Sequence, residues 1–376
     1  MKIAVNTRFL MPNKLEGIGW FTHEVLQRWV TWYPEHEFVF IFDRAYSEEF
    51  IFGDNVKAIA SFPPARHPLL FWWWYERTIP KILRQEKADV FVSPDGFTSL
   101  HTKVPSLMVL HDIAWKHFPN QVYYTAQKFY EHYVPKYCQK ATQIATVSTY
   151  SKQDIVQSFD IDSDKITVVH NGSHTNYQPL AEAQKETIQQ QYTAGCPYFL
   201  YVGSIHPRKN VANLLRAFEQ FKQQNPSNLK LVLAGRMAWQ TGEIGTLLPT
   251  LKHKDSIVFL GYVPNEQLPL IVGAAYAMTY VSLFEGFGIP LLEAMSCGVP
   301  CITSNTSSMP EVVGNAGLLV EPTDVSDIAT KMQDIWSDKS LYQKLVTNCE
   351  VQAAKFSWDL TARKLWDCLL KCVPNN

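Results

Sequence analysis

The sequence lacks the cysteine and histidine patterns of a metal site or a disulfide framework. Its seven cysteines are scattered over 376 residues, and no Cys-x-x-Cys pair occurs. Cys297 and Cys301, like Cys368 and Cys372, are four residues apart and have no histidines close by. An odd number of scattered thiols is typical of an intracellular protein with buried cysteines. We therefore expect neither bound zinc nor disulfide bonds.

Long apolar runs and an excess of one charge are also missing. The longest aromatic run, residues 69–75, is far shorter than the about 20 apolar residues that a membrane-spanning helix needs. No charged segment followed by an apolar one precedes the first predicted strand, so we expect no signal peptide. The formal net charge of −1 gives no bulk electrostatic reason for a nucleic-acid partner. These absences predict a cytoplasmic protein, with a peripheral position on the inner membrane face left open.

What the sequence does contain is an alternation of short apolar segments and longer amphipathic ones. A hydrophobic content of 46% over 376 residues can build two or three domains. The alternation predicts parallel sheets covered by helices, which is the α/β class. Strands are predicted at residues 3–6, 38–42, 56–60, 90–93, 106–110, 144–147, 166–169, 198–202, 230–234, 257–260, 277–281, 301–303 and 318–320. Helices are predicted at residues 20–32, 69–84, 125–139, 149–159, 211–224, 242–251, 266–272, 290–297, 326–336 and 341–354.

The polar stretch 178–195 divides this alternation into two similar series. It is rich in Gln, Glu, Lys and Ala and has no strand signal, so we interpret it as a linker with a surface helix. The division predicts an N-terminal domain at residues 1–177 and a C-terminal domain at residues 196–355, each Rossmann-like. Residues 356–376 carry apolar side chains at helical spacing and predict a final helix. From the spacing alone, that helix could equally well close the second domain.

The most informative stretch is EGFGIPLLEAM, residues 285–295, which follows a predicted buried strand. It passes through two glycines into a helix that Pro290 can begin, because the missing N–H of proline is unpaired there in any case. A strand, a glycine turn and a helix direct backbone N–H groups at a phosphate. Glu285 before the turn and Glu293 in the first helical turn can accept hydrogen bonds from sugar hydroxyls. The residues alone indicate a sugar-nucleotide site, although an ordinary buried strand–helix unit would share the apolar positions.

This stretch, with two glutamates eight residues apart, resembles the signature of the family 4 retaining glycosyltransferases of GT-B fold. The resemblance implies two Rossmann-like domains that face each other across a cleft, with the final helix packing back on the first. The first domain would bind the acceptor and the second the nucleotide-sugar donor. We expect Glu293 to hold the nucleotide ribose and Glu285 the transferred sugar. The donor-binding residues implied within the stretch are Gly286, Phe287, Gly288, Ile289 and Glu293.

A second motif, PRKN at residues 207–210, lies between a predicted strand and a predicted helix, shortly after Gly203. Arg208 and Lys209 are adjacent cations at a helix start, where the helix dipole disfavours positive charge. A bound diphosphate would make the two cations favourable at this position, because Arg can bind it bidentately and Lys adds a point charge. The motif resembles the family element that neutralises the donor diphosphate, which implies that Gly203, Arg208 and Lys209 bind the donor. Many relatives carry Arg directly after the glycine, where this chain has Ser204, so Arg208 is the main guanidinium candidate. A solvated basic turn is the structural alternative.

Two weaker motifs lie in the first domain. Gly17 and Gly19 form a Gly-x-Gly before the first predicted helix, but the completing glycine of a dinucleotide fingerprint is absent, which argues against a nicotinamide enzyme. By resemblance, the backbone of this loop faces the donor phosphate. His111 follows a predicted strand and precedes Asp112. It resembles the family histidine that contacts the donor hexose, and a purely structural histidine is the alternative.

Two further segments are open to structural interpretations. Ser148 is a good N-cap for the helix predicted after it, in a block that resembles the family's VSxxSK element, whose Lys152 could contact a phosphate or the acceptor. Asp160 and Asp162 form an Asp-x-Asp, which binds metal in another glycosyltransferase fold. Because they lie in a polar loop, we expect a solvated turn and no metal.

Residues 66–87 combine three consecutive tryptophans with five basic side chains. Helices that lie on anionic membranes have this composition, and so do core helices with one basic edge. Pro80 would kink or end such a helix. We therefore expect either contact with an anionic membrane surface or a buried aromatic face that leaves only the cations outside.

Together these motifs predict a metal-independent, retaining glycosyltransferase that uses a nucleotide-diphosphate sugar as substrate and needs no cofactor. The predicted catalytic residues are Glu285, Arg208, Lys209 and His111. The combined motifs resemble mannosyltransferases of surface-polysaccharide pathways, which implies mannose from GDP-mannose and a glycan or lipid-linked hydroxyl as acceptor. Three alternatives stay open. These are a phosphorylase of the same fold, for which no pyridoxal-phosphate lysine motif stands out, a hydrolase, and a non-catalytic nucleotide-sugar-binding protein.

Overall fold

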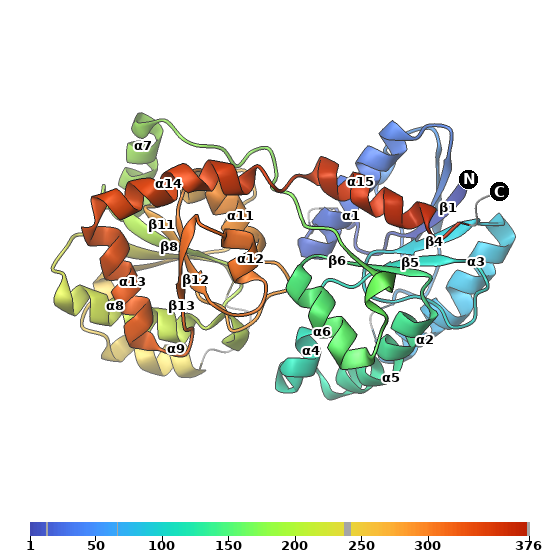
Figure 1. The fold of residues 1–376 in the computed structure, drawn as a ribbon, viewed down its shortest axis with the longest axis horizontal. Helices are drawn as coiled ribbons and strands as arrows, with labels where there is room; N and C mark the ends of the chain where they lie inside the picture. Colours follow the sequence, from blue (N-terminus) through green and yellow to red (C-terminus); the bar gives the residue numbers. More distant parts are fainter. Residues whose placement is uncertain (13, 66, 237–241, 374–376) are drawn as a thin grey trace. The chain divides into compact units, whose positions relative to one another are not determined.

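A computed structural model describes residues 1–12, 14–65, 67–236 and 242–373 of the chain. The chain forms two compact units (Figure 1). Unit 1 comprises Met1–Gly172 and the C-terminal segment from Ser357 onward, and unit 2 comprises Ser173–Phe356. Sequence analysis set the end of the first domain at residue 177, five residues later. The stretch interpreted as a linker, 178–195, lies within unit 2 and contains a helix there.

Unit 1 is built on a seven-stranded parallel sheet with the order β3-β2-β1-β4-β5-β6-β7. Its strands are β1 (Lys2–Asn6), β2 (Glu37–Phe42), β3 (Val56–Ala60), β4 (Val90–Ser93), β5 (Ser106–Val109), β6 (Gln143–Thr146) and β7 (Ile166–Val168). Its helices are α1 (Gly17–Trp32), α2 (Pro68–Trp73), α3 (Ile79–Glu86), α4 (Ala114–His117), α5 (Tyr124–Lys140), α6 (Thr149–Phe159) and α15 (Trp358–Leu370). The five inner strands are almost entirely buried, as parallel strands covered on both faces must be, whereas the edge strands β3 and β7 are partly exposed.

Unit 2 repeats this plan with a six-stranded parallel sheet of order β10-β9-β8-β11-β12-β13. Its strands are β8 (Tyr198–Val202), β9 (Lys230–Ala234), β10 (Ile257–Gly261), β11 (Ala277–Tyr280), β12 (Cys301–Ser304) and β13 (Gly317–Val320). Its helices are α7 (Glu182–Thr193), α8 (Val211–Gln224), α9 (Gly242–Leu247), α10 (Leu268–Gly273), α11 (Ile289–Ser296), α12 (Met309–Val313), α13 (Val325–Ser337) and α14 (Lys339–Ala353). Each strand of both units overlaps a predicted one, and the predicted α/β class with two Rossmann-like domains is confirmed.

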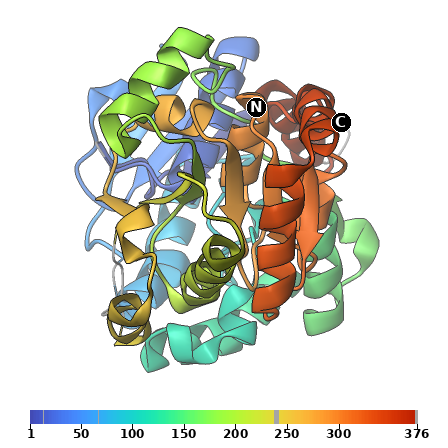
Figure 2. The same cartoon turned by 90° about the vertical axis from the view of Figure 1, so that its left-hand side faces the viewer.

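Helices cover both faces of each sheet. In unit 1, α1 and α15 lie on one face, whereas α2, α3, α5 and α6 pack against the other (Figure 1). In unit 2, α8, α9 and α13 form one layer and α7, α10, α11 and α14 form the other (Figures 1 and 2). Each sheet reverses its strand order once, between β1 and β4 in unit 1 and between β8 and β11 in unit 2. Ligands of doubly wound sheets bind at the carboxyl ends of strands at such a switch point.

The C-terminal helix α15 belongs to unit 1, as the resemblance implied. It packs along α1, where the indole of Trp29 donates a hydrogen bond of 2.8 Å to the carbonyl of Ala362. Trp366 stacks on Tyr33 with ring centroids 3.6 Å apart. This helix therefore supplies half of the layer that covers one face of the unit-1 sheet.

One predicted helix is interrupted. The segment predicted as a single helix over residues 69–84 consists of α2, a π-helical turn at Trp74–Thr78, and α3. Pro80 was expected to kink or end the helix, and the helix does change from α to π geometry at Trp74–Thr78, just before Pro80, which has no N–H to bond to the turn before it. The wider π turn allows Trp74, Tyr75 and Glu76 to be buried side by side. Within the described residues, no helix is both long enough and apolar enough to cross a membrane.

Candidate active site

The loops after β8 and β9 touch at two glycines. Gly203 has φ of 146° and Gly235 has φ of 153°, a region that disfavours other residues. A Cβ atom on Gly235 would lie 1.8 Å from the carbonyl oxygen of Gly203, so no side chain fits there. Gly203 was predicted as a donor-binding residue, whereas Gly235 was not, because its partner is 32 residues away in the sequence. The contact fixes the backbone from which the predicted cation motif begins.

The PRKN motif forms a short 3-10 turn, Pro207–Lys209, that leads into α8. Asn210 follows with φ of 59° and anchors the turn through its side-chain amide. The amide donates hydrogen bonds to the carbonyl of Val281, at 3.0 Å, and to that of Pro322, at 2.6 Å. The turn after β8 is thereby tied to the end of β11, across the switch point. Asn210 thus positions the two cations, a role that the sequence motif did not reveal.

Glu285 lies between these two cations. Its Oε1 atom accepts hydrogen bonds from Lys209 Nζ at 2.6 Å and from the hydroxyl of Tyr280 at 3.0 Å. Arg208 contacts Oε2 at 3.4 Å and also donates to the backbone carbonyl of Phe284. The structure therefore brings together three of the four predicted catalytic residues. It adds Tyr280, which lies under Lys209 with the ammonium 5.2 Å from the ring centre.

In this cluster two cations contact one buried carboxylate. Glu285 is buried, which favours its neutral form, but the charges of Lys209 and Arg208 outweigh burial and hold the pKa of Glu285 below its usual value. One carboxylate therefore faces two cations. The side chains of Arg208 and Lys209 keep 21% and 14% of their surface accessible. The cluster can thus accept a further anion from solvent.

The glycine turn after Glu285 is held by two serines. The Glu285 N–H donates to Ser307 Oγ at 3.1 Å, and Ser308 Oγ donates to the carbonyls of Glu285 and Phe287 at 2.9 and 3.0 Å. Gly286 and Gly288 are buried, and Gly288 precedes α11 with φ of 95°. The helix begins at Ile289, one residue before the predicted start at Pro290. The turn therefore presents backbone groups at a helix N-terminus, as the pattern predicted.

Phe287, also predicted as a donor-binding residue, is 4% exposed and packs edge-on against Phe356 in the core of unit 2. Its ring is therefore part of the hydrophobic core, and its backbone is what the glycine turn presents. The apolar contact explains why an aromatic residue stands between two glycines. Sequence alone does not distinguish a ring that packs inward from one that stacks on a ligand.

Glu293 lies in the second turn of α11, not in the first as predicted. The hydroxyl of Tyr177 forms a hydrogen bond with its carboxyl group. Burial raises the pKa of Glu293 to about 7, although the Tyr177 hydrogen bond partly opposes the shift. Tyr177 comes from the segment that was assigned to the end of the first domain, so the sequence did not pair the two residues. A half-ionised carboxyl at neutral pH is a hydrogen-bond acceptor whose strength depends on pH.

His111 lies in unit 1, at the carboxyl end of β5. Its Nε2 atom is 2.9 Å from the carbonyl of Pro94, and its ring packs edge-on against Phe21 with centroids 5.0 Å apart. A carbonyl only accepts hydrogen bonds, so Nε2 carries the proton. Burial lowers the pKa of His111 below its usual value, more than the Pro94 carbonyl and Asp112 raise it. The ring is therefore neutral at pH 7 and its Nδ1 is an acceptor.

The other residues predicted in unit 1 take structural positions. Gly17 and Gly19, placed by the sequence in a loop, form the first turn of α1. Ser148 is the N-cap of α6 and accepts a hydrogen bond from the N–H of Ser151, as predicted. Asp160 ends α6, and Asp162 accepts from the N–H of Asp164 in a polar turn. Within the described ranges, no group of three or more His, Cys, Asp or Glu residues has the arrangement of a metal site.

The switch point of unit 1 also holds an ion pair. Arg8, after β1, donates from Nε to Asp95 Oδ2, after β4, at 2.6 Å. Asp95 also accepts from Asn6 at 2.9 Å, from Tyr75 at 2.5 Å and from Ser93 at 3.0 Å. The side chains of Arg8 and Asp95 are 9% and 1% exposed. Sequence analysis singled out neither residue of this pair, because no motif surrounds them.

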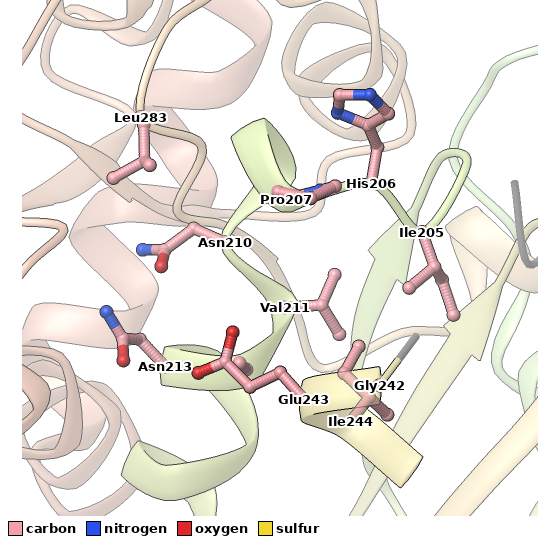
Figure 3. Close-up of a pocket in the computed structure, with 11 residues that line it drawn as sticks. Ile205, His206, Pro207, Asn210, Val211, Asn213, Gly242, Glu243, Ile244 and Leu283 are labelled. Carbon is pink, nitrogen blue, oxygen red and sulfur yellow. The ribbon is translucent and has the colours of Figure 1, made fainter. Parts of the chain in front are cut away.

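A pocket of about 330 Å³ lies beside the cation turn of unit 2 (Figure 3). Its apolar wall includes Val211, Ile244 and Leu283, and its polar wall includes Asn213 and Glu243. It lies in the α8–α9 layer, whereas Glu293 is on α11 in the opposite layer. The pocket and the predicted ribose site are therefore on different faces of the sheet.

Comparison with known proteins agrees with this architecture. Two family models match, "Glycosyltransferase Family 4" over residues 16–177 and "Glycosyl transferases group 1" over residues 184–352. Among solved structures, a glycosyltransferase from Rickettsia africae has a TM-score of 0.75 at 17% identity and covers 100% of this chain and 99% of its own. The Anabaena protein Alr3699/HepE, crystallised with UDP and glucose, has a TM-score of 0.77 at 17% identity, with 98% and 99% covered. These structures establish the GT-B fold, which was the predicted one.

Sequence relatives are more specific. The chain is 33% identical over 278 residues to O-antigen chain mannosyltransferase B of Escherichia coli, which covers 74% of this chain and 73% of that protein. It is 29% identical over 240 residues to O-antigen chain mannosyltransferase RfbU of Salmonella typhimurium, with 62% and 63% covered. It also matches 29% of the length of the serotype-specific mannosyltransferase WbdA of Escherichia coli, at 27% identity. The chain is a glycosyltransferase and belongs to family 4, as its sequence motifs predicted.

Proposed function

We propose that this protein transfers mannose from GDP-mannose to a hydroxyl group of a glycan or lipid-linked acceptor in the synthesis of a surface polysaccharide. The observation that carries the proposal is the cluster of Arg208, Lys209 and Glu285 at the switch point of unit 2, beside the N-terminus of α11. The choice of mannose is supported by the relatives named as O-antigen mannosyltransferases. With such an acceptor, the protein would work at the cytoplasmic face of the membrane.

In this proposal the two cations hold the diphosphate of the donor. Their side chains keep access to solvent, and together with the backbone N–H groups at the start of α11 they favour an anion at this position. As the bond between the anomeric carbon and the phosphate oxygen breaks, negative charge grows on the departing diphosphate. Arg208 and Lys209 stabilise that charge more in the transition state than in the bound substrate, which is what accelerates the reaction.

Glu285 and Glu293 then act as hydrogen-bond acceptors for hydroxyl groups. Glu285 accepts from the transferred mannose while its ammonium and guanidinium partners contact the diphosphate. Glu293 accepts from the ribose, and His111 accepts a mannose hydroxyl at Nδ1. The acceptor oxygen bonds to the anomeric carbon on the face that the diphosphate leaves, and its proton passes to the leaving phosphate oxygen. The configuration is therefore retained, and the step requires neither a metal ion nor a protein base.

Incubation with a panel of nucleotide sugars and a mannose-containing acceptor tests this proposal. We expect transfer from GDP-mannose, a product whose anomeric configuration matches the donor by NMR, and no loss of rate with a metal chelator. A thermal-shift screen should select the same nucleotide, because a ligand at 100 times its dissociation constant stabilises the folded state by about 2.7 kcal/mol. Release of free mannose without transfer would instead indicate a hydrolase. Transfer from another donor would reject the mannosyl assignment while leaving the family unchanged.

A further inference from the structure

Two helical segments on the same face of unit 1 carry one pattern of exposed side chains. The first stripe runs along α2, the π turn and α3 and consists of Leu69, Trp73, Arg77, Lys81 and Arg84. The second stripe runs along α5 and consists of Tyr124, Lys128, His132, Lys136 and Lys140, with Tyr123 just before it. Residues about four apart share one side of a helix. Each stripe therefore begins with apolar or aromatic side chains and continues with cations.

The two stripes lie side by side, and their helical segments run in the same direction from N-terminus to C-terminus. Phe71 on the first segment contacts Phe129 on the second, with ring centroids 5.7 Å apart. Further along both segments, Tyr75 contacts Tyr137 at 6.3 Å. Because the contacts advance in the same direction along both segments, the helices are parallel and their N-termini lie at the same end. Figure 1 shows α2 and α5 next to each other below the unit-1 sheet.

The aromatic and apolar residues at this shared end are unusually exposed. Leu69 is 73% exposed, Trp73 51%, Tyr123 86% and Tyr124 75%. The neighbouring Trp74 and Tyr75 are buried in the core, so only part of the aromatic segment predicted at residues 66–87 reaches the surface. Four large side chains from two elements thus form one exposed group, which we call the aromatic tip. Exposed apolar groups of this size mark interaction surfaces.

Behind the tip, positive charge dominates. Six cations lie on the exposed sides of the two segments, namely Arg77, Lys81, Arg84, Lys128, Lys136 and Lys140. Within residues 68–86 and 124–140, all of which are described, Glu131 is the only exposed carboxylate. It pairs with Lys128, whereas Lys81, Arg84 and Lys140 have no acidic partner among the described residues. The whole chain has a net charge of −1, so this surface is a local concentration of positive charge.

We propose that this surface docks unit 1 on an anionic lipid bilayer, with the aromatic tip in the headgroup region and the cations along the membrane surface. Tyr and Trp rings prefer the membrane interface because one end of each is apolar and the other polar. Lys and Arg near an anionic leaflet each strengthen binding roughly fivefold. A nucleic acid or an acidic protein would match the cations but would leave Leu69 and Trp73 without apolar surroundings. The charge pattern and the tip together therefore favour lipid.

Docking at the tip also suits the proposed reaction, on which this part of the inference rests. In parallel α/β units each helix begins near the carboxyl end of the strand before it, and that end of β5 carries His111. The tip and His111 are therefore at the same edge of the unit-1 sheet. A lipid-linked acceptor would reach that edge directly from the bilayer.

Sedimentation of the full chain with phosphatidylcholine vesicles, with and without phosphatidylglycerol, tests the docking surface. We expect binding only to the vesicles that contain phosphatidylglycerol, and weaker binding as salt is added. Lys81→Glu combined with Lys136→Glu should lower the partition coefficient at least tenfold. Trp73→Ser combined with Tyr124→Ser should lower it roughly fivefold or more. A matched control, Lys339→Glu with Lys344→Glu on α14, makes the same charge change on exposed unit-2 residues and should bind like the wild type.

The outcomes separate this inference from the proposed function. Vesicle binding is measured without nucleotide sugar, and transfer to a water-soluble acceptor is measured without vesicles, with circular dichroism confirming that each variant is folded. Wild-type protein that fails to bind anionic vesicles at low salt overturns the docking surface even if transfer is normal. Equal loss in the control pair overturns it as well. Heparin binding that needs the cations but not the aromatic tip would replace the membrane with a soluble polyanion.

Discussion

The switch points of the two units both place a cation next to a carboxylate, but the two ion pairs differ in burial and in their hydrogen bonds. Each sheet carries a cation after its first central strand and a carboxylate after the strand that reverses the order. In unit 1 Arg8 meets Asp95, and tyrosine, serine and asparagine groups complete the hydrogen bonds of that carboxylate. In unit 2 Glu285 meets Arg208 and Lys209. The first ion pair is buried, whereas the cations of the second keep access to solvent.

The difference lies in what surrounds each pair. In unit 1 the π-helical turn brings Tyr75 over Asp95, and the carboxylate is 1% exposed. In unit 2 the side chains of Arg208 and Lys209 retain access to solvent. A buried, fully bonded ion pair fixes a structure, whereas a cluster of charges that solvent can reach can bind a ligand. The fold thus sets where the ion pair lies, and the local packing decides whether the pair stabilises the structure or is available to a ligand.

The largest expected effect is on the stability of the buried pair. Asp95→Ala would leave the buried Arg8 without its carboxylate partner, which costs about 3–5 kcal/mol of unfolding free energy. Glu285→Ala should cost clearly less, because the cations it releases can reach water. Urea denaturation of both variants measures the two values. Equal losses would show that the two switch points do not differ as described.

The next effect is on turnover at the cluster that solvent can reach. Charge-assisted hydrogen bonds contribute about 1.5–3 kcal/mol each, so Arg208→Ala should lower kcat at least tenfold in a folded protein. Arg216→Ala is the matched control, because Arg216 is a half-buried arginine on α8 that pairs with Glu243 and does not contact Glu285. Its kcat should stay within about twofold of the wild type, as surface changes usually do. A normal kcat for Arg208→Ala would remove the proposed role in stabilising the diphosphate.

A smaller effect concerns nucleotide binding and its pH dependence. Glu293→Ala should weaken binding of the nucleoside diphosphate about tenfold, whereas Glu285→Ala should mainly lower turnover. Because the pKa of Glu293 is raised to about 7, its carboxyl ionises between neutral and mildly alkaline pH. The ionised form accepts ribose hydrogen bonds better, so affinity should rise with pH through about 7. Isothermal titration of wild type and Glu293→Gln should show a slope only in the wild type.

The raised pKa of Glu293 also affects folding stability, which should fall with rising pH, whereas nucleotide affinity should rise. The folded state holds the Glu293 proton more tightly than the unfolded state does, so folding stability should fall as pH rises from about 4.5 to about 7. Glu285, whose pKa is lowered, stabilises the fold above its usual pKa and loses that contribution only as pH falls through its folded value. A stability curve for Glu293→Gln that still declines over the first interval would assign the slope to another group.

The smallest expected effect is at His111. A neutral hydrogen bond contributes about 0.5–1.5 kcal/mol, so His111→Asn should retain a few times more activity than His111→Ala. The lowered pKa of His111 keeps its ring neutral above the usual histidine pKa, so this residue should give no pH dependence between pH 7 and 8. Two equally inactive variants, together with a wild-type rate that follows a single pKa near 6.5, would make His111 a general base.

Much of this architecture could be predicted from the sequence. Parallel strands are short apolar runs, and the glycine turn before α11 has a residue pattern that few other structures need. What could not be predicted depends on contacts between distant residues. Tyr177 meets Glu293 from 116 positions away, and Asn210 reaches Pro322 across 112 positions. Neither contact has a local signature.

The errors have equally specific causes. The helix predicted over 69–84 is interrupted by a π turn just before Pro80, and the tertiary contacts of Tyr75 and Glu76 hold that turn. Phe287 packs inward because its ring contacts that of Phe356, which lies 69 positions later in the sequence. Not all aromatic side chains of residues 66–87 reach the surface, because Trp74 is buried in the core of unit 1 by contacts with distant residues.

The place of α15 in unit 1 has a consequence for how the protein is made. The strands of unit 1 leave the ribosome first, yet the helix that completes their covering layer follows the whole of unit 2 in the chain. Unit 2, residues 173–356, emerges in between, which takes on the order of 10–40 s at typical elongation rates. During that time Trp29 and Tyr33 lack their partners on α15. Unit 1 is therefore completed only after unit 2 has been translated, and its apolar face needs protection until α15 has emerged.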